Sequence, residues 1–106
     1  MTEYLQIFST VDNEEAAGRI ATALVKRRLA ACVQIVPNLR SVYWWQGKVE
    51  EAGEYLLLIK STREQYPALE RAIRELHPYD CPELVGLKVE TGLRAYLDWL
   101  QNEVKK

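Results

Sequence analysis

The sequence of 106 residues is poor in the residues that usually build metal and redox centres. It contains one histidine and two cysteines, Cys32 and Cys81, which lie far apart without the close pairing typical of zinc sites. This usage favours reduced thiols in a reducing compartment over a disulfide framework. Redox chemistry is therefore not supported by the cysteine pattern, and zinc-type pairing is absent.

The chain also lacks an excess of either charge and a long apolar run. Lys and Arg number 14 against 15 Asp and Glu, so no net field would hold a polyanion, and we expect no nucleic-acid partner. No apolar run reaches the length of a membrane span, and the N-terminus does not resemble a signal peptide. A cytoplasmic protein without a membrane partner is expected. Because 48% of the residues are apolar, residues 1–106 should form a single domain.

A strand followed by a helix is predicted at the start of the chain. Residues 4–10 alternate loosely and are rich in strand-forming side chains. Asp12 can cap the following helix, with Glu15 three residues farther on. The helix continues with apolar residues at three- and four-residue spacing and ends in a basic run, Lys26-Arg27-Arg28, at the negative end of the helix dipole.

Two long strands are predicted in the middle of the sequence. They cover residues 31–45 and 48–62, and only Gln46 and Gly47 separate them. A two-residue loop that contains glycine is typical of a tight β-hairpin, since glycine accepts the positive φ that such turns require. Pro37 cannot donate to a strand ladder and should mark a bulge or an edge in the first strand.

The second half of the chain predicts a helix, a strand and a further helix. Thr62–Gln65 has the form of a capping box before a helix that runs to Leu76. The segment 77–83 ends this helix because its two prolines cannot continue it. A last strand is predicted over residues 84–90, and a third helix from Thr91. The expected apolar face and final residues of that helix are Leu93, Tyr96, Leu97, Leu100, Val104, Lys105 and Lys106.

This order of elements predicts an α+β fold. Strands that alternate with single helices, with one hairpin between them, give the ferredoxin-like βαββαβ sandwich, here with an extra C-terminal helix. The sheet should be four-stranded and antiparallel, with two helices on one face.

The central hairpin is too long for such a domain. An arm of roughly 14 residues spans about 46 Å, whereas a compact chain of this length has a diameter of roughly 33 Å. The overhang carries Val42, Tyr43, Trp44 and Trp45. We expect these residues to be buried against another copy of the chain, since monomers rarely leave such a patch bare. A peptide- or ligand-binding lip, or a hairpin folded back at Pro37, are the alternatives.

Five segments resemble the motifs of the CutA family, the divalent-cation tolerance proteins, in the same order and at the same spacing. They are LAACVQIVP, SVYWWQGKVEE, YLLLIKST, HPYDCPEL and YLDWL. The resemblance covers essentially the whole chain. It implies a ferredoxin-like subunit in a tight cytoplasmic homotrimer, with the long hairpins in intersubunit sheets. It also implies an association with copper and other divalent metals, and a structural kinship with the trimeric PII signalling proteins.

His77 and Cys81 are the candidate metal ligands. They share a short loop with Asp80 and Glu83, and imidazole, thiolate and carboxylate together suit Cu²⁺ or Zn²⁺. A histidine before a proline at a helix end is also commonly a capping or hydrogen-bonded structural residue, and a cysteine is commonly an apolar filler. Both interpretations stay open for these residues and for Cys32.

Departures from the family pattern favour weak metal binding. Some relatives bring a cysteine and a second histidine to a proposed copper site, at the positions of Ser9 and Leu76 in this chain. Of that set, only the residue matching His77 is retained. We therefore expect copper or another divalent cation to bind weakly or indirectly, and folding to require no cofactor.

The kinship with PII proteins supplies a second hypothesis. In it, a trimeric sensor binds a small anionic ligand in clefts between subunits and signals to a protein partner. Lys60, Tyr79 and Glu83 are the candidate lining residues, although a lysine at a strand end is usually solvated. Neither hypothesis involves an enzyme, since the chain has no glycine-rich phosphate loop, nucleophile elbow or HExxH motif, and we expect no catalytic residue.

Overall fold

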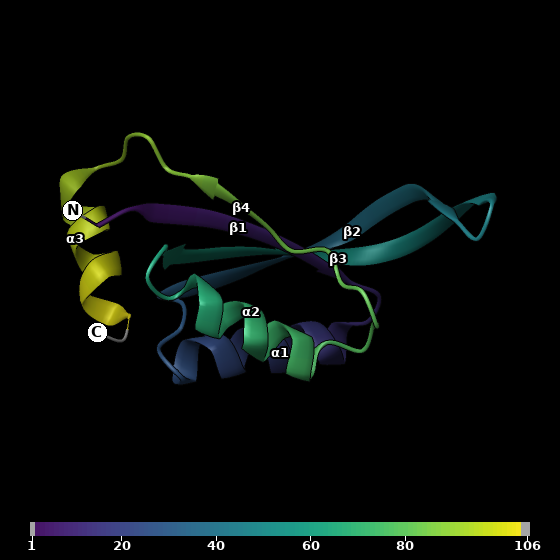
Figure 1. Ribbon diagram of the computed structural model, residues 1–106, viewed down its shortest axis with the longest axis horizontal. Helices are drawn as coiled ribbons and strands as arrows, with labels where there is room; N and C mark the ends of the chain where they lie inside the picture. Colours follow the sequence, from purple (N-terminus) through teal and green to yellow (C-terminus); the bar gives the residue numbers. More distant parts are fainter. Residues whose placement is uncertain (1, 105–106) are drawn as a thin grey trace.

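A computed structural model describes residues 2–104, which form four strands and three helices in the predicted order. The elements are β1 (Tyr4–Val11), α1 (Glu14–Lys26), β2 (Cys32–Trp45), β3 (Lys48–Thr62), α2 (Tyr66–Leu76), β4 (Val85–Lys88) and α3 (Arg94–Glu103). The strands form one antiparallel sheet in the order β2-β3-β1-β4. α1 and α2 lie on the same face of this sheet, and α3 lies at the end opposite the hairpin tip (Figure 1). The ferredoxin-like prediction is confirmed.

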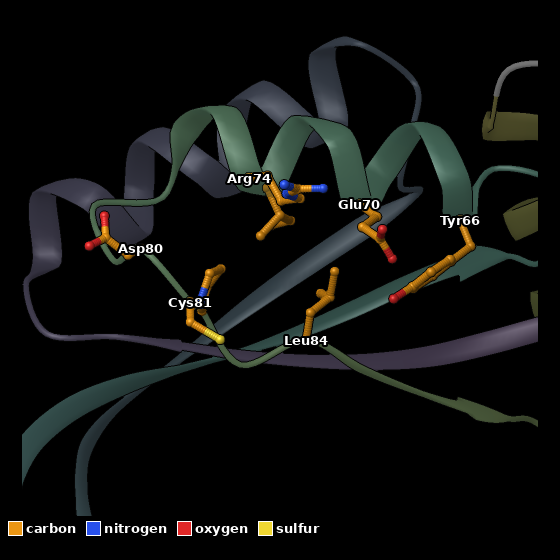
Figure 2. A pocket seen from close by; sticks show the side chains of 8 residues that line it. Tyr66, Glu70, Arg74, Asp80, Cys81 and Leu84 are labelled. Atoms are coloured by element: carbon orange, nitrogen blue, oxygen red, sulfur yellow. The ribbon is translucent and has the colours of Figure 1, made fainter. Parts of the chain in front are cut away.

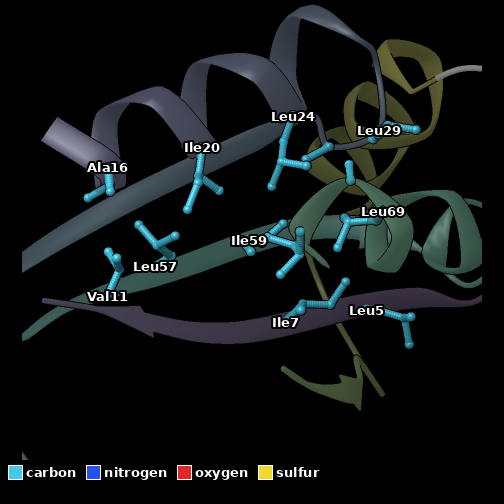
Figure 3. Close-up of a cluster of buried hydrophobic side chains, with 14 residues drawn as sticks. Leu5, Ile7, Val11, Ala16, Ile20, Leu24, Leu29, Leu57, Ile59 and Leu69 are labelled. Carbon is cyan, nitrogen blue, oxygen red and sulfur yellow. The ribbon is translucent and has the colours of Figure 1, made fainter. Parts of the chain in front are cut away.

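The main core lies between the sheet and the two helices (Figure 3). Alternate residues of β1 and β3 point toward the helices, which is the two-residue period of a strand with one buried face. Ile7 and Ile59 are completely buried, as are Ile20 and Leu24 of α1 and Leu69 of α2. Each such aliphatic side chain contributes about 1.5–3 kcal/mol when fully buried. None of the helices in residues 2–104 is long and apolar enough to cross a membrane.

The starts of the first two helices differ from the prediction. β1 extends to Val11, and Asn13 rather than Asp12 caps α1, with its Oδ1 accepting from the Ala16 N–H at 2.7 Å. The capping-box prediction at Thr62 is wrong. Thr62 is the last residue of β3, and its buried hydroxyl has no hydrogen-bond partner within residues 2–104. Strand pairing continues to Val11, next to the expected cap Asp12, and to Thr62 itself.

The C-terminal elements are shorter than predicted. β4 has four residues, and α3 begins at Arg94 instead of Thr91. Tyr4 packs with Leu97, Leu100 and Val104 in a second apolar cluster. Leu93 and Tyr96, which were expected on this inner face, are exposed. The final lysines expected to end this helix, Lys105 and Lys106, lie outside the described residues.

The basic run at the end of α1 links this helix to α2 and α3. Lys26 is the last residue of α1, as the helix dipole favours. Arg27 forms an ion pair with Glu75 of α2, and Arg28 forms one with Glu103 of α3. Because all four of these side chains are solvent-exposed, each pair contributes about 0–1 kcal/mol.

The β2–β3 hairpin has the predicted turn and the predicted bulge. Gln46 and Gly47 both have positive φ, 50° and 80°, as a type I′ turn requires. Pairing between β2 and β3 shifts between Val36 and Leu39 and then resumes as far as Trp45. The bulge at Pro37 therefore does not fold the hairpin back over its own sheet. The hairpin projects past both helices and gives the chain a long axis of 44 Å (Figure 1).

Substitutions at Gln46 test the assigned turn. Gln46→Asn should raise the free energy of unfolding by about 0.5 kcal/mol, since asparagine tolerates positive φ better than glutamine. Gln46→Val should lower it by about 1 kcal/mol, because a β-branched residue is strained there. Guanidinium unfolding at a fixed protein concentration measures both changes. Equal stability of the three proteins would contradict a type I′ turn.

Candidate functional site

His77 is held by hydrogen bonds through both ring nitrogens. It follows the last residue of α2 and is 7% exposed. Its Nε2 lies 2.7 Å from the Thr10 carbonyl oxygen, which can only accept, so Nε2 carries the proton and donates. Its Nδ1 accepts from the Tyr79 backbone N–H at 3.1 Å. The hydrogen-bonded structural interpretation of His77 is confirmed, and a metal ion could bind the ring only by displacing one of these partners.

A buried carboxylate joins the same loop to the base of the hairpin. The Tyr79 hydroxyl donates to Glu54 Oε2 at 2.7 Å, and the Ser41 hydroxyl donates to Oε1 at 2.6 Å. Burial, together with the hydrogen bond and negative charge of Glu54, raises the pKa of Tyr79 far above its ordinary value. The Tyr79 ring also packs edge-on against His77, with ring centroids 4.6 Å apart.

The sequence did not single out Glu54 or Ser41 as candidate residues. Their side chains meet only because the strand pairing places Leu39 opposite Glu54 and Ser41 opposite Ala52, two residues farther along the hairpin. One signal was present in the sequence. Glu54 immediately precedes the apolar run Tyr55–Ile59 on a strand that enters the core, where a carboxylate requires hydrogen-bond donors.

The remaining candidate ligands are dispersed. Cys81 is exposed, and Cys32 is partly buried at the start of β2. Ser9 is buried and donates to the backbone carbonyl of Glu83 at 2.7 Å, and Leu76 packs against the main core. Throughout residues 2–104, no group of three or more His, Cys, Asp or Glu side chains is placed to hold a metal ion. Metal ligation by His77 and Cys81 thus stays a prediction.

The proposed cleft residues are not adjacent in one chain. Lys60 donates to the Gln34 side chain at 2.5 Å and is paired with Gln6 across the sheet. Thr10, which binds His77, is four residues farther along β1, about 13 Å at the usual strand rise. Lys60 therefore lies apart from the loop that contains Tyr79 and Glu83, and a cleft formed by all three would need a second subunit.

The sheet face away from α1 and α2 is rich in apolar side chains. The pairing places Phe8 between Leu58 and Val85 on this face, and Leu56 beside Val36. Val85 and Leu87 of the edge strand β4 are about half exposed, at 48% and 53%. We call this surface the open sheet face. It is defined by Phe8, Val36, Leu56, Leu58, Val85 and Leu87.

The hairpin tip adds a second exposed apolar surface. Trp44 is 74% exposed and Trp45 59%, and Val42 and Val49 are exposed as well. Exposed apolar area of this kind usually marks an interaction site. The open sheet face and the hairpin tip are therefore the main exposed apolar surfaces of residues 2–104.

These features define a ferredoxin-like α+β subunit with an extended β2–β3 hairpin. The model of the CutA1 divalent ion tolerance protein family matches residues 5–103. The chain belongs to this family.

Individual relatives agree with this assignment. The divalent-cation tolerance protein CutA of Thermus thermophilus is 53% identical over 95 residues, covering 90% of this chain and 92% of that protein. The crystal structure of CutA1 from Oryza sativa has a TM-score of 0.96 at 40% identity, covering 98% of this chain and 95% of that one. The periplasmic divalent cation tolerance protein CutA of Archaeoglobus fulgidus has a TM-score of 0.91 at 34% identity, covering 99% and 100%. The chain spans 56% of the full-length chloroplastic rice protein CutA 1.

Tyr79→Phe should make stability less sensitive to alkaline pH. The folded chain raises the pKa of Tyr79, so the protonated Tyr79 hydroxyl stabilises the folded state. This stabilisation is complete below the unfolded pKa of about 10 and is lost as the pH rises above that value. Between pH 9 and pH 11, the wild type should lose about 1 kcal/mol more than the variant, allowing for partial solvent screening. Guanidinium unfolding at both pH values measures the difference. Equal losses would show that the folded state does not hold this hydroxyl protonated.

Proposed function

We propose that this chain acts in divalent-cation tolerance as a cytoplasmic, non-enzymatic homotrimer that responds to metal by weak or indirect binding. The observation that carries the proposal is the projecting hairpin, whose apolar tip is left exposed by residues 2–104. The role in cation tolerance is supported by family membership and by the name of the Thermus relative, with which this chain shares 53% identity.

Assembly is supported by the two exposed apolar surfaces. Both edge strands of the sheet, β2 and β4, have unpaired backbone groups along their outer sides, and such edges readily pair with another chain. Association through the open sheet face and the hairpin would bury apolar area and satisfy these groups together. The number of subunits, three, follows from the family resemblance.

Weak or indirect metal binding is supported by the two hydrogen bonds that the ring nitrogens of His77 already make. Ligation through Nδ1 would remove the hydrogen bond from the Tyr79 N–H, and ligation through Nε2 would remove the bond to Thr10. Each lost hydrogen bond costs about 0.5–1.5 kcal/mol, and more where a buried group is left unpaired. Any cation bound here must offset that cost with few protein ligands.

The assembly is tested by placing a charge on the hairpin. Trp45→Asp should dissociate the trimer, because a carboxylate in a desolvated interface costs several kcal/mol. Gln65→Asp, at the start of α2, should leave it intact, since aspartate is favoured at helix starts. Light scattering should give three times the chain mass for the wild type and this control. A wild-type monomer at micromolar concentration would refute the assembly.

The metal response is tested with Zn²⁺, which does not oxidise thiols, followed by Cu²⁺. At pH 7.5 the wild type should bind with a dissociation constant of roughly 10 µM or weaker, about −7 kcal/mol. His77→Gln retains an N–H donor for Thr10 but removes the imidazole, and Cys81→Ser removes the thiol. Calorimetry of all three trimers measures the affinities. Submicromolar, stoichiometric binding that both substitutions abolish would establish a direct site and contradict weak binding.

A further inference from the structure

A cavity of about 340 Å³ lies between α2 and the segment 80–84. This volume is at the lower end of the range of about 300–1,000 Å³ that small-molecule sites occupy. Ile73, Pro82 and Leu84 supply apolar lining. Figure 2 shows the Cys81 sulfur directed toward Leu84, below the helix. The cavity is separate from the hydrogen bonds of His77 and Glu54, but it shares Cys81 with the candidate metal ligands.

The cavity also has charged side chains of both signs on one helix. Glu70 and Arg74 are four residues apart on α2, and both line it. Such a pair often forms an ion pair, yet within residues 2–104 the Arg74 side chain forms no ion pair or hydrogen bond. Figure 2 shows the Glu70 carboxylate and the Tyr66 hydroxyl directed into the gap between the helix and the strand. Asp80 adds a second carboxylate to the lining.

Tyr66 is suited to act as a neutral hydrogen-bond donor in this cavity. The Tyr66 hydroxyl is neutral at physiological pH because a tyrosine ordinarily has a pKa of about 10. Burial and the neighbouring Glu70 carboxylate raise the pKa of Tyr66 further. Its ring, with the side chains of Pro82 and Leu84, can cover one side of a flat or branched apolar group.

We propose that this cavity binds a small zwitterion of the α-amino-acid class with an apolar side chain. The ligand carboxylate pairs with Arg74, its ammonium group pairs with Glu70, and its side chain lies on Tyr66, Pro82 and Leu84. A simple anion would meet the carboxylates of Glu70 and Asp80, and a simple amine would meet Arg74. Only a ligand with both charges gives both Arg74 and Glu70 an opposite partner.

Three probes of one carbon skeleton test the proposal on the full chain. L-phenylalanine has both charges, phenethylamine lacks the carboxylate, and 3-phenylpropanoate lacks the ammonium group. In two-dimensional ¹⁵N–¹H NMR spectra, L-phenylalanine should produce saturable shifts at Ile73, Cys81 and Leu84 at millimolar concentration. The other two probes should bind at least ten-fold more weakly. Bound L-phenylalanine should also slow the alkylation of Cys81 by iodoacetamide and leave Cys32 unaffected.

Substitutions on α2 test whether Arg74 and Glu70 pair with the two charged groups of the ligand. Arg74→Gln and Glu70→Gln should each weaken L-phenylalanine binding about ten-fold, whereas Arg71→Gln, on the same helix but outside the cavity, should not change it. Absence of saturable shifts around the cavity with L-phenylalanine would overturn the proposal. Equal binding of either single-charge probe would overturn it too, as would an equal loss in all three variants. These measurements are independent of the subunit mass and the Zn²⁺ affinity, which test the proposed function.

Discussion

The length of the β2–β3 hairpin is the constraint on which the rest of this structure depends. α1 and α2 have 13 and 11 residues and so extend about 20 and 17 Å, whereas the 15 residues of β3 extend about 50 Å if straight. The helices can therefore cover only the part of the sheet near the main core. The part of the hairpin that projects beyond them has apolar side chains that residues 2–104 leave largely exposed, and the proposed assembly is based on that mismatch.

Two buried ionisable groups, Glu54 and His77, lie where the hairpin leaves the core. Glu54 is buried there and accepts hydrogen bonds from two hydroxyl groups, and His77 is buried beside it with both nitrogens bonded. A buried carboxylate or imidazole without partners would be strongly destabilising. The loop after α2 is consequently fixed to both β1 and the hairpin. A metal ion could bind the His77 ring only by displacing one of these hydrogen-bond partners.

The amphipathic elements could be predicted from residue patterns, and the details of their ends could not. The turn at Gln46 and Gly47, the bulge at Pro37 and the order of strands and helices depend on local backbone chemistry and on periodicity. The cap of α1 and the start of α2 depend on how far strand pairing continues, which is a long-range property. His77 was foreseen both as a structural residue and as a ligand. Its partner, Thr10, is 67 residues away in the chain, and only the folded chain distinguishes those roles.

By itself, the sequence determined the α+β class, the overlong hairpin and the family, because these depend on period, turn residues and motif spacing along the chain. Only the tertiary structure decided which polar side chains have hydrogen-bond or ion-pair partners within residues 2–104. It joined Tyr79 and Glu54, separated Lys60 from that loop, and placed Arg74 beside a cavity without an ion-pair partner in residues 2–104. The physical reason is that hydrogen bonds and ion pairs act over a few ångströms in space, between residues whose distance along the chain carries no record of that proximity.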